Sequence, residues 1–186
     1  MEKFVFIYGP QAVGKMTVGQ ALSRITRLKL FHNHMTIEML HPLFGYTAEM
    51  WRLAKLFRNE IFEAYSKTDN YGLIFTKVWD FSSEKECQEI ERMCGIFESK
   101  NIEVYFIELE ADTEERLNRN RTSNRLEHKP TKRNIQESEE HLLSTVESKR
   151  LNSLEGELET EHYLRINNTN LSAEEVAHKI KNHFNL

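Results

Sequence analysis

The stretch Gly9–Thr17, with the sequence GPQAVGKMT, decides the fold that we expect for this chain. It directly follows Lys3–Tyr8, a run of aromatic and β-branched residues that is typical of a fully buried parallel strand. After it, apolar residues recur at the spacing of a helix from about Lys15 to Arg27. The sequence therefore predicts a tight turn from a buried strand into an amphipathic helix.

This turn has the pattern G-x-x-x-x-G-K, which predicts a phosphate-binding loop. Its glycines allow backbone angles that turn several N–H groups toward one anion, and the helix N-terminus adds partial positive charge. The side chain of Lys15 can reach the β- and γ-phosphates of a nucleoside triphosphate, most simply ATP, although GTP stays open. The candidate nucleotide-binding residues of the loop are Gly9, Gln11, Ala12, Val13, Gly14, Lys15, Met16 and Thr17.

One position departs from the pattern. The residue after the lysine is usually Ser or Thr, whose hydroxyl binds Mg²⁺, whereas Met16 stands here. A thioether is a poor ligand for a hard cation. We therefore expect Mg²⁺ to be held mainly through the phosphates and water, with no protein metal ligand.

The rest of the chain alternates strand and helix patterns. Further strands are expected at Lys29–Phe31, Leu73–Val78, Ile102–Leu109 and His162–Ile166. A long helix is expected at Thr47–Ser66, with an apolar face of Met50, Leu53, Ala54, Phe57, Ile61 and Ala64. Three further helices are expected to begin after the caps Ser83, Asp112 and Ser172. Another is expected from about Asn134 to Arg150. This order predicts an α/β fold with a five-stranded parallel sheet covered by helices on both faces, and ligands at the carboxyl ends of its strands.

Length and composition set limits on function. A chain of 186 residues suits one domain, and its net charge of −4 argues against general nucleic-acid binding. No apolar run is long enough to span a membrane and no signal peptide is evident, so a cytoplasmic location is expected. Cys87 and Cys94 are expected to be reduced residues of an apolar helix face. The sequence gives no oligomeric state.

With its loop, element order and arginine-rich stretch, the chain resembles the small P-loop kinases of the nucleoside-monophosphate-kinase and shikimate-kinase group, most closely bacterial proteins labelled shikimate-kinase-like. The resemblance implies a three-layer P-loop NTPase fold over residues 1–186, with a mobile lid at about 118–133 and an acceptor-side insertion at about 32–68. It also implies transfer of the γ-phosphoryl group of ATP to a small acceptor.

The resemblance assigns roles to the lid and the last strand. Family lids carry one arginine that packs on adenine and another that neutralises the transferred phosphoryl group. The family pattern R-L-x-x-R lies around Arg116 in this chain. We assign the packing on adenine to Arg119 and the neutralisation of the phosphoryl group to Arg125. Asn168, in the loop after the last strand, would border the adenine. The alternatives are a solvated helix end for the arginines and a capping turn for Asn168.

Acceptor contacts are expected from side chains that follow the second and third strands. His32, His34 and Trp79 are candidates, as are Arg52 and Arg58 on the following helix, where they could hold an anionic acceptor. Packing, or a solvated helix face, is the alternative for each, and the H-x-H pair is a weaker candidate for metal binding. The third strand ends at Thr76 where an acidic residue is usual, so Asp80 is the nearest candidate base. Because the acidic residue and glycines of shikimate kinases are missing, shikimate is not the expected acceptor.

The sequence thus predicts an ATP-dependent kinase with Lys15, Arg125 and Asp80 as catalytic residues and an unidentified small-molecule acceptor. Three alternatives stay open. One is a nucleotide-binding protein without transfer activity, which Met16 and Thr76 favour. The second is sulfuryl transfer from a phosphoadenosine donor. The third is a polynucleotide-end kinase, which the acidic net charge disfavours.

Overall fold

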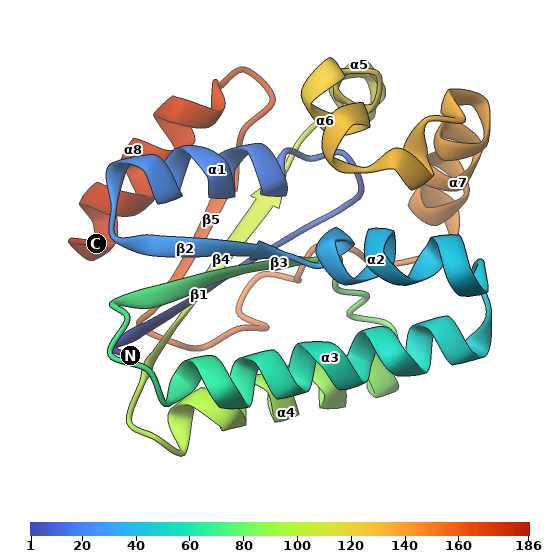
Figure 1. Cartoon of the computed structure of the whole chain (residues 1–186). Coiled ribbons are helices and arrows are strands. Elements are labelled where there is room, and N and C mark those ends of the chain that lie inside the picture. The colour runs from blue at the N-terminus through green and yellow to red at the C-terminus, as the bar shows by residue number, and fades with distance from the viewer.

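A computed structural model describes all residues, 1–186, and contains one sheet of five parallel strands. The strands are β1 (Lys3–Tyr8), β2 (Leu28–His32), β3 (Gly72–Lys77), β4 (Glu103–Glu110) and β5 (Tyr163–Asn167). Their order across the sheet is β2-β3-β1-β4-β5, with β1 at the centre (Figure 1). The carboxyl end of β1, where the phosphate loop begins, therefore lies between those of β3 and β4.

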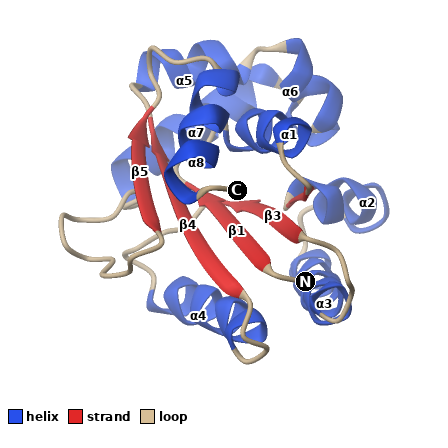
Figure 2. Ribbon diagram, turned by 90° about the vertical axis from the view of Figure 1, so that its left-hand side faces the viewer, coloured by secondary structure: helices blue, strands red, loops and turns tan.

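Helices cover both faces of the sheet, which confirms the predicted three-layer α/β arrangement (Figure 2). On one face α1 (Lys15–Ile25) and α8 (Ala173–Phe184) pack on a core that includes Val5, Ile7 and Ile107. On the other, α3 (Ala48–Ser66) and α4 (Glu84–Glu98) cover an aromatic core. That core contains Phe4, Phe6, Tyr8, Phe62, Phe75 and Phe97. The alternating side chains of β1 fill both cores, as expected for a buried central strand.

The segment after β2 differs from the prediction. It contains an additional helix, α2 (His34–Phe44), which the sequence analysis missed because Pro42 lies inside its last turn. The buried stripe of α3 is also shifted by part of a turn. Phe57 and Ile61 are each 38% exposed, whereas Arg58 is buried. The buried positions Met50, Ala54, Arg58, Phe62 and Ser66 recur every four residues, and packing against α2 and α4 selects this face.

The lid is helical, although the sequence indicated an irregular basic stretch. The segment at about 118–133 contains the end of α5 (Thr113–Asn120), α6 (Ser123–His128) and the 3₁₀ turn η1 (Pro130–Lys132), and α7 (Ile135–Ser148) follows it. These elements lie together beyond the carboxyl ends of the strands (Figure 1). The predicted helix Asn134–Arg150 is confirmed as α7, with Asn134 as its N-cap. The lid thus lies over the phosphate loop.

Both cysteines are free thiols, with Cys94 buried and Cys87 partly buried, as predicted. Among the helices, α3 is the longest, and none combines the length and apolar character that a membrane span requires.

Candidate active site

The phosphate loop has a conformation that requires its glycines. Gly9 has φ 136° and Gly14 has φ 106°, both values that favour glycine. A Cβ on Gly9 would lie 2.2 Å from the carbonyl O of Leu109, so this position also has no room for a side chain. Ala12 has φ 58°, which places it in the left-handed region as well. The close approach of the loop to β4 therefore depends on Gly9.

The first turn of α1 has no side chain that caps its backbone N–H groups. Its N-cap, Gly14, offers no capping side chain, and the turn contains no acidic residue. The amide N–H groups at the start of a helix have no partner within the helix, and the helix dipole adds positive potential there. An oxyanion at this position would satisfy these groups.

Lys15 points back into the loop. Its Nζ donates to the carbonyl oxygens of Gly9, at 2.7 Å, and Pro10, at 2.6 Å. Burial lowers the pKa of Lys15 well below its ordinary value of 10.5, and the nearby cations Lys129, Arg125 and Arg116 lower it further. Because no carboxylate opposes this effect, the site has a positive charge that an anion would neutralise.

Two arginines of α5 hold the loop in place. Arg116 is buried and its Nε donates to the carbonyl O of Gln11 at 2.8 Å, while its Nη2 has no partner. Arg119 donates through Nη1 to the carbonyl O of Val13 at 2.9 Å and through Nη2 to that of Asn168 at 2.7 Å. The amide of Asn168 also donates to Val13 O at 2.9 Å. Arg119 and Asn168 therefore join the loop, the lid and the segment after β5.

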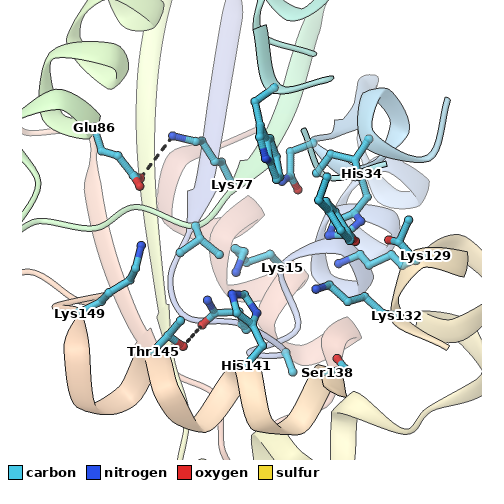
Figure 3. Close-up of a pocket in the computed structure, with 18 of the residues that line it drawn as sticks. Lys15, His34, Lys77, Glu86, Lys129, Lys132, Ser138, His141, Thr145 and Lys149 are labelled. Atoms are coloured by element: carbon cyan, nitrogen blue, oxygen red, sulfur yellow. Dashed lines mark hydrogen bonds and ion pairs between the residues drawn. The ribbon is translucent and has the colours of Figure 1, made fainter. Parts of the chain in front are cut away.

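Two cavities meet at this loop. The smaller, of about 370 Å³, lies beside the start of α1 and is lined by Arg119, Asn168 and the apolar side chains of Leu171 and Ala173. The larger, of about 920 Å³, lies between α2, α3, α4 and the lid (Figure 3). Four residues line both cavities, namely Ala12, Lys15, Arg125 and Lys129. Three of these four are cations, so positive charge is concentrated where the cavities join.

The larger cavity is strongly cationic although the chain as a whole is acidic. Ten lysine and arginine side chains and three glutamates line it. The cations are Lys15, Arg52, Lys55, Arg58, Lys77, Lys85, Arg125, Lys129, Lys132 and Lys149, and the acids are Glu86, Glu89 and Glu137. Such a cavity attracts an anionic ligand.

Three of the predicted acceptor residues line this cavity. Arg58 is buried and donates only to neutral groups, the hydroxyl of Thr36 at 2.8 Å and the carbonyl O of Asn33 at 3.1 Å. Burial lowers its pKa to about 10. Arg52 lies at the exposed rim, where it pairs with Glu49. Arg58 thus presents a buried positive charge that forms no salt bridge, although the charge of Glu89 partly opposes the effect of burial.

His34 also lines the cavity, but its ring is already bonded. Its Nδ1 lies 2.9 Å from Oε1 of Glu38, one turn later in α2. The same carboxylate accepts from the lid, through the N–H of Thr131 at 3.0 Å and its hydroxyl at 2.5 Å. Burial lowers the pKa of His34 to about 3, and the pair with Glu38 only partly opposes this effect. His34 therefore orients the carboxylate that ties the lid to α2.

Three other predicted residues do not line either of these cavities, contrary to the expectation. Trp79 is 6% exposed and stacks on Phe81 in the aromatic core, with ring centroids 4.1 Å apart. His32 is buried beside β3, and its Nδ1 has no hydrogen-bond partner. The carboxylate of Asp80 accepts from the N–H and hydroxyl of Ser82, at 3.0 and 2.5 Å. Asp80 thus stabilises the turn that precedes α4.

Two acidic groups of α4 line the cavity from this side, Glu89, which lies 3.5 Å from Nζ of Lys77, and Glu86. Oε2 of Glu86 lies 3.4 Å from Nζ of Lys77, the last residue of β3, and accepts the N–H of Asp80 at 3.3 Å (Figure 3). Sequence reasoning missed Glu86 because it was interpreted only as part of a helix cap. Lys129 and Glu38 were also missed. A lysine next to the lid arginines and a carboxylate one turn after His34 were the available signals.

Few side chains near the phosphate loop could bind a magnesium ion. Met16 is 3% exposed and presents sulfur where a hydroxyl oxygen is usual. Glu108, at the end of β4, is fully buried, and its two oxygens accept five hydrogen bonds from Tyr8, Asn152, Ser153 and Tyr163. Glu115, the acid that lines the smaller cavity, pairs with Arg119 at 2.7 Å. No cluster of three or more His, Cys, Asp or Glu side chains could hold a metal ion.

Comparison of the fold with solved structures agrees with the expected resemblance. A sugar kinase from Janibacter sp. HTCC2649 aligns with a TM-score of 0.61 and 14% sequence identity over 100% of this chain and 95% of that chain. A gluconokinase from Sinorhizobium meliloti 1021 aligns with a TM-score of 0.58 and 13% sequence identity over 99% of this chain and 91% of that chain. Shikimate kinase from Aquifex aeolicus aligns with a TM-score of 0.52 and 15% sequence identity over 98% of this chain and 96% of that chain.

The chain therefore has the fold of small-molecule P-loop kinases. Its sequence matches no protein-family model and no curated protein.

Proposed function

We propose that this protein is an ATP-dependent kinase that transfers the γ-phosphoryl group to a small anionic acceptor. The observation that carries the proposal is the junction of the two cavities, which Lys15, Arg125 and Lys129 line together. A γ-phosphoryl group at this junction would lie between nucleotide and acceptor, surrounded by cations. Positioning and charge stabilisation of this kind provide most of the catalysis in phosphoryl transfer. The kinase fold of the neighbours supports the same activity.

On the nucleotide side, the phosphates would occupy the loop Gly9–Thr17 and the start of α1. The smaller cavity would then hold the nucleoside, with Arg119 and Asn168 on one side and Leu171 on the other. The guanidinium of Arg119 already donates to backbone carbonyls. It would therefore contact adenine through its flat face rather than through its N–H groups.

On the acceptor side, the larger cavity would hold a molecule with a hydroxyl group and at least one negative charge. Arg58 supports this class because its buried guanidinium donates hydrogen bonds only to neutral groups and forms no salt bridge. Arg52 and His34 would border the same molecule from the rim and from α2. A neutral sugar would leave the charge of Arg58 uncompensated, which is costly in a buried site.

In the reaction, the acceptor oxygen would bond to the γ-phosphorus while the bond from that phosphorus to the β–γ bridging oxygen breaks, which releases ADP. The hydroxyl proton would pass to a carboxylate, for which Glu86 is better placed than Asp80 because it lines the cavity. Lys15 and Arg125 would stabilise the charge on the phosphoryl oxygens. Mg²⁺ would arrive with the nucleotide, held by phosphates and water, and would neutralise part of the phosphate charge.

The test combines binding and turnover. Thermal unfolding is measured with ATP, GTP, ADP and phosphoadenosine-phosphosulfate, and γ-labelled ATP is then offered with hydroxy acids, sugar phosphates and neutral sugars. We expect ATP to stabilise the chain and label to appear in an anionic acceptor, and Lys15→Ala to abolish this transfer. Full transfer by Lys15→Ala would refute the mechanism. Binding without transfer to any acceptor would favour a nucleotide-binding protein, and preference for the sulfate donor would favour sulfuryl transfer.

A further inference from the structure

The loop lacks the protein ligand that usually connects Mg²⁺ to nucleotide binding. Met16 cannot supply an oxygen, and Glu115, the one acid beside the smaller cavity, is paired with Arg119. The positive potential around the expected triphosphate must then come from side chains. Lys15 and Arg125 were expected from the sequence to supply it, but Lys129 was not.

Lys129 lies between α6 and η1 and lines both cavities. In Figure 3 its side chain extends from the lid toward the space in front of Lys15, next to Lys132. Its charge lowers the pKa of Lys15, so the two ammonium groups interact across the junction. Lys129 forms no salt bridge, and burial together with the neighbouring cations Arg125 and Lys132 lowers its pKa to about 7. An anionic ligand beside it would therefore favour its charged form.

The lid segment that carries Lys129 is fixed on both sides. Before it, His128 Nε2 lies 3.3 Å from the amide nitrogen of Gln20, and Asn124 donates to Gln20 Oε1 at 3.0 Å, which attaches α6 to α1. After it, Thr131 donates twice to Glu38 of α2. These contacts are made by groups of the chain itself and hold Lys129 over the loop. A preorganised charge binds its partner without the cost of ordering the segment.

We propose that Lys129 supplies the positive charge at the triphosphate that P-loop proteins otherwise obtain from Mg²⁺ held by the loop hydroxyl, so that nucleotide binding does not depend on the metal. The proposal rests on the proposed function in one respect, that a nucleoside triphosphate occupies the loop. It concerns binding and leaves open whether Mg²⁺ accelerates transfer. Arg125 and Lys15 alone would leave more of the phosphate charge uncompensated in a site with little solvent.

The experiment is calorimetric titration of the full chain with ATP, once with Mg²⁺ and once with EDTA. We expect the two Kd values to agree within about threefold, since no protein ligand couples the metal to binding. Lys129→Met should raise the Kd in EDTA about tenfold or more, the effect of losing one hydrogen bond to a charged group. Lys132→Met, three residues away and lining only the larger cavity, is the matched control and should change it less than about threefold.

A second variant tests the same idea in the other direction. Met16→Thr restores a hydroxyl at the usual metal-ligand position, and we expect it to make ATP binding tighter in Mg²⁺ than in EDTA. Thermal unfolding of each variant without ligand verifies that it is folded.

The outcomes separate this proposal from the proposed function. ATP binding by the wild-type chain that is lost in EDTA would overturn the role of Lys129 while leaving the kinase proposal intact. Equal losses in Lys129→Met and Lys132→Met would overturn it as well, because the effect would then reflect general lid charge. Absence of ATP binding in both conditions would overturn both proposals.

Discussion

Nη1 of Arg119 lies 2.9 Å from the carbonyl oxygen of Val13, so that a side chain of the lid is bonded to the backbone of the phosphate loop. The same guanidinium donates to both oxygens of Asn168 and pairs with Glu115. The loop, the last strand and the lid are therefore connected through one residue. These hydrogen bonds hold the loop in its observed shape.

Replacement of Arg119 by Ala is expected to destabilise the chain and weaken nucleotide binding together. It removes charge-assisted hydrogen bonds to partly buried carbonyls, so the free energy of unfolding should fall by about 2 kcal/mol. Urea unfolding measures this change. Arg121→Ala is the control, since Arg121 is exposed and pairs with Glu139 at the surface, a contact of small effect. Equal stability of Arg119→Ala and the wild-type chain would contradict the connecting role of Arg119.

His32 should make stability depend on pH in the acidic range. Burial, together with the charges of Lys129 and His128, lowers its pKa from 6.5 to about 4, and Glu38 only partly opposes this effect. The unfolded chain binds a proton at this histidine below pH 6.5, whereas the folded chain does so only near pH 4. Stability is therefore lost as pH falls from 6.5 to 4, by up to about 3 kcal/mol from this group.

The measurement is urea unfolding at pH 7 and pH 4.5 for the wild-type chain and His32→Gln. The variant keeps His34, Glu38 and the other acids, so any difference in pH slope belongs to His32. We expect a shallower loss of stability in the variant. Identical slopes would mean that His32 titrates normally in the folded chain and is accessible to solvent.

Replacement of the two carboxylates near the end of β3, Glu86 and Asp80, should affect different properties of the protein. Glu86 lines the larger cavity beside Lys77, whereas Asp80 accepts hydrogen bonds from Ser82 outside it. Glu86→Gln should therefore lower kcat by about 100-fold or more with little change in stability, as expected for loss of a general base. Asp80→Asn should mainly reduce stability.

Single-turnover rates and thermal unfolding of both variants test this assignment. A large loss of kcat in Asp80→Asn with normal stability would return the role of base to Asp80.

Much of the fold could be predicted because the patterns that determine it are local. The run Lys3–Tyr8 is apolar on both sides, as a central strand must be, and the loop glycines follow it directly. The helix α2 escaped prediction because Pro42 and a short apolar run resemble a loop. The buried face of α3 was misplaced because its burial is set by α2 and α4, which a single periodic pattern does not contain.

Residues of the candidate site could be predicted only where a suitable residue type lies in or next to a recognisable sequence motif. Lys15 and Arg119 lie in or beside motifs, and the structure places both at the loop. Trp79 was assigned by its place after β3, but a large aromatic side chain next to Phe81 is better packed inside the core than in a polar cavity. Lys129 and Glu86 reach the cavities from segments whose position depends on tertiary contacts. The neighbouring lid arginines were the only local signal for Lys129, and Glu86 had none.

Lys15 should lower the stability of the nucleotide-free chain, because its charge is buried among other cations. Its pKa is well below 10.5 in the folded chain, so the unfolded chain binds the proton more tightly, and stability should rise as pH increases toward 10.5.

Lys15→Met removes a buried charge whose desolvation costs several kcal/mol, against the loss of hydrogen bonds to Gly9 and Pro10 worth about 1.5–3 kcal/mol each. We therefore expect the variant to unfold at the same temperature as the wild-type chain or a higher one. ATP, which should add about 2.7 kcal/mol to the wild type at 100 times its Kd, should add almost nothing to the variant. A less stable variant that ATP still stabilises would show that Lys15 serves the fold rather than the nucleotide.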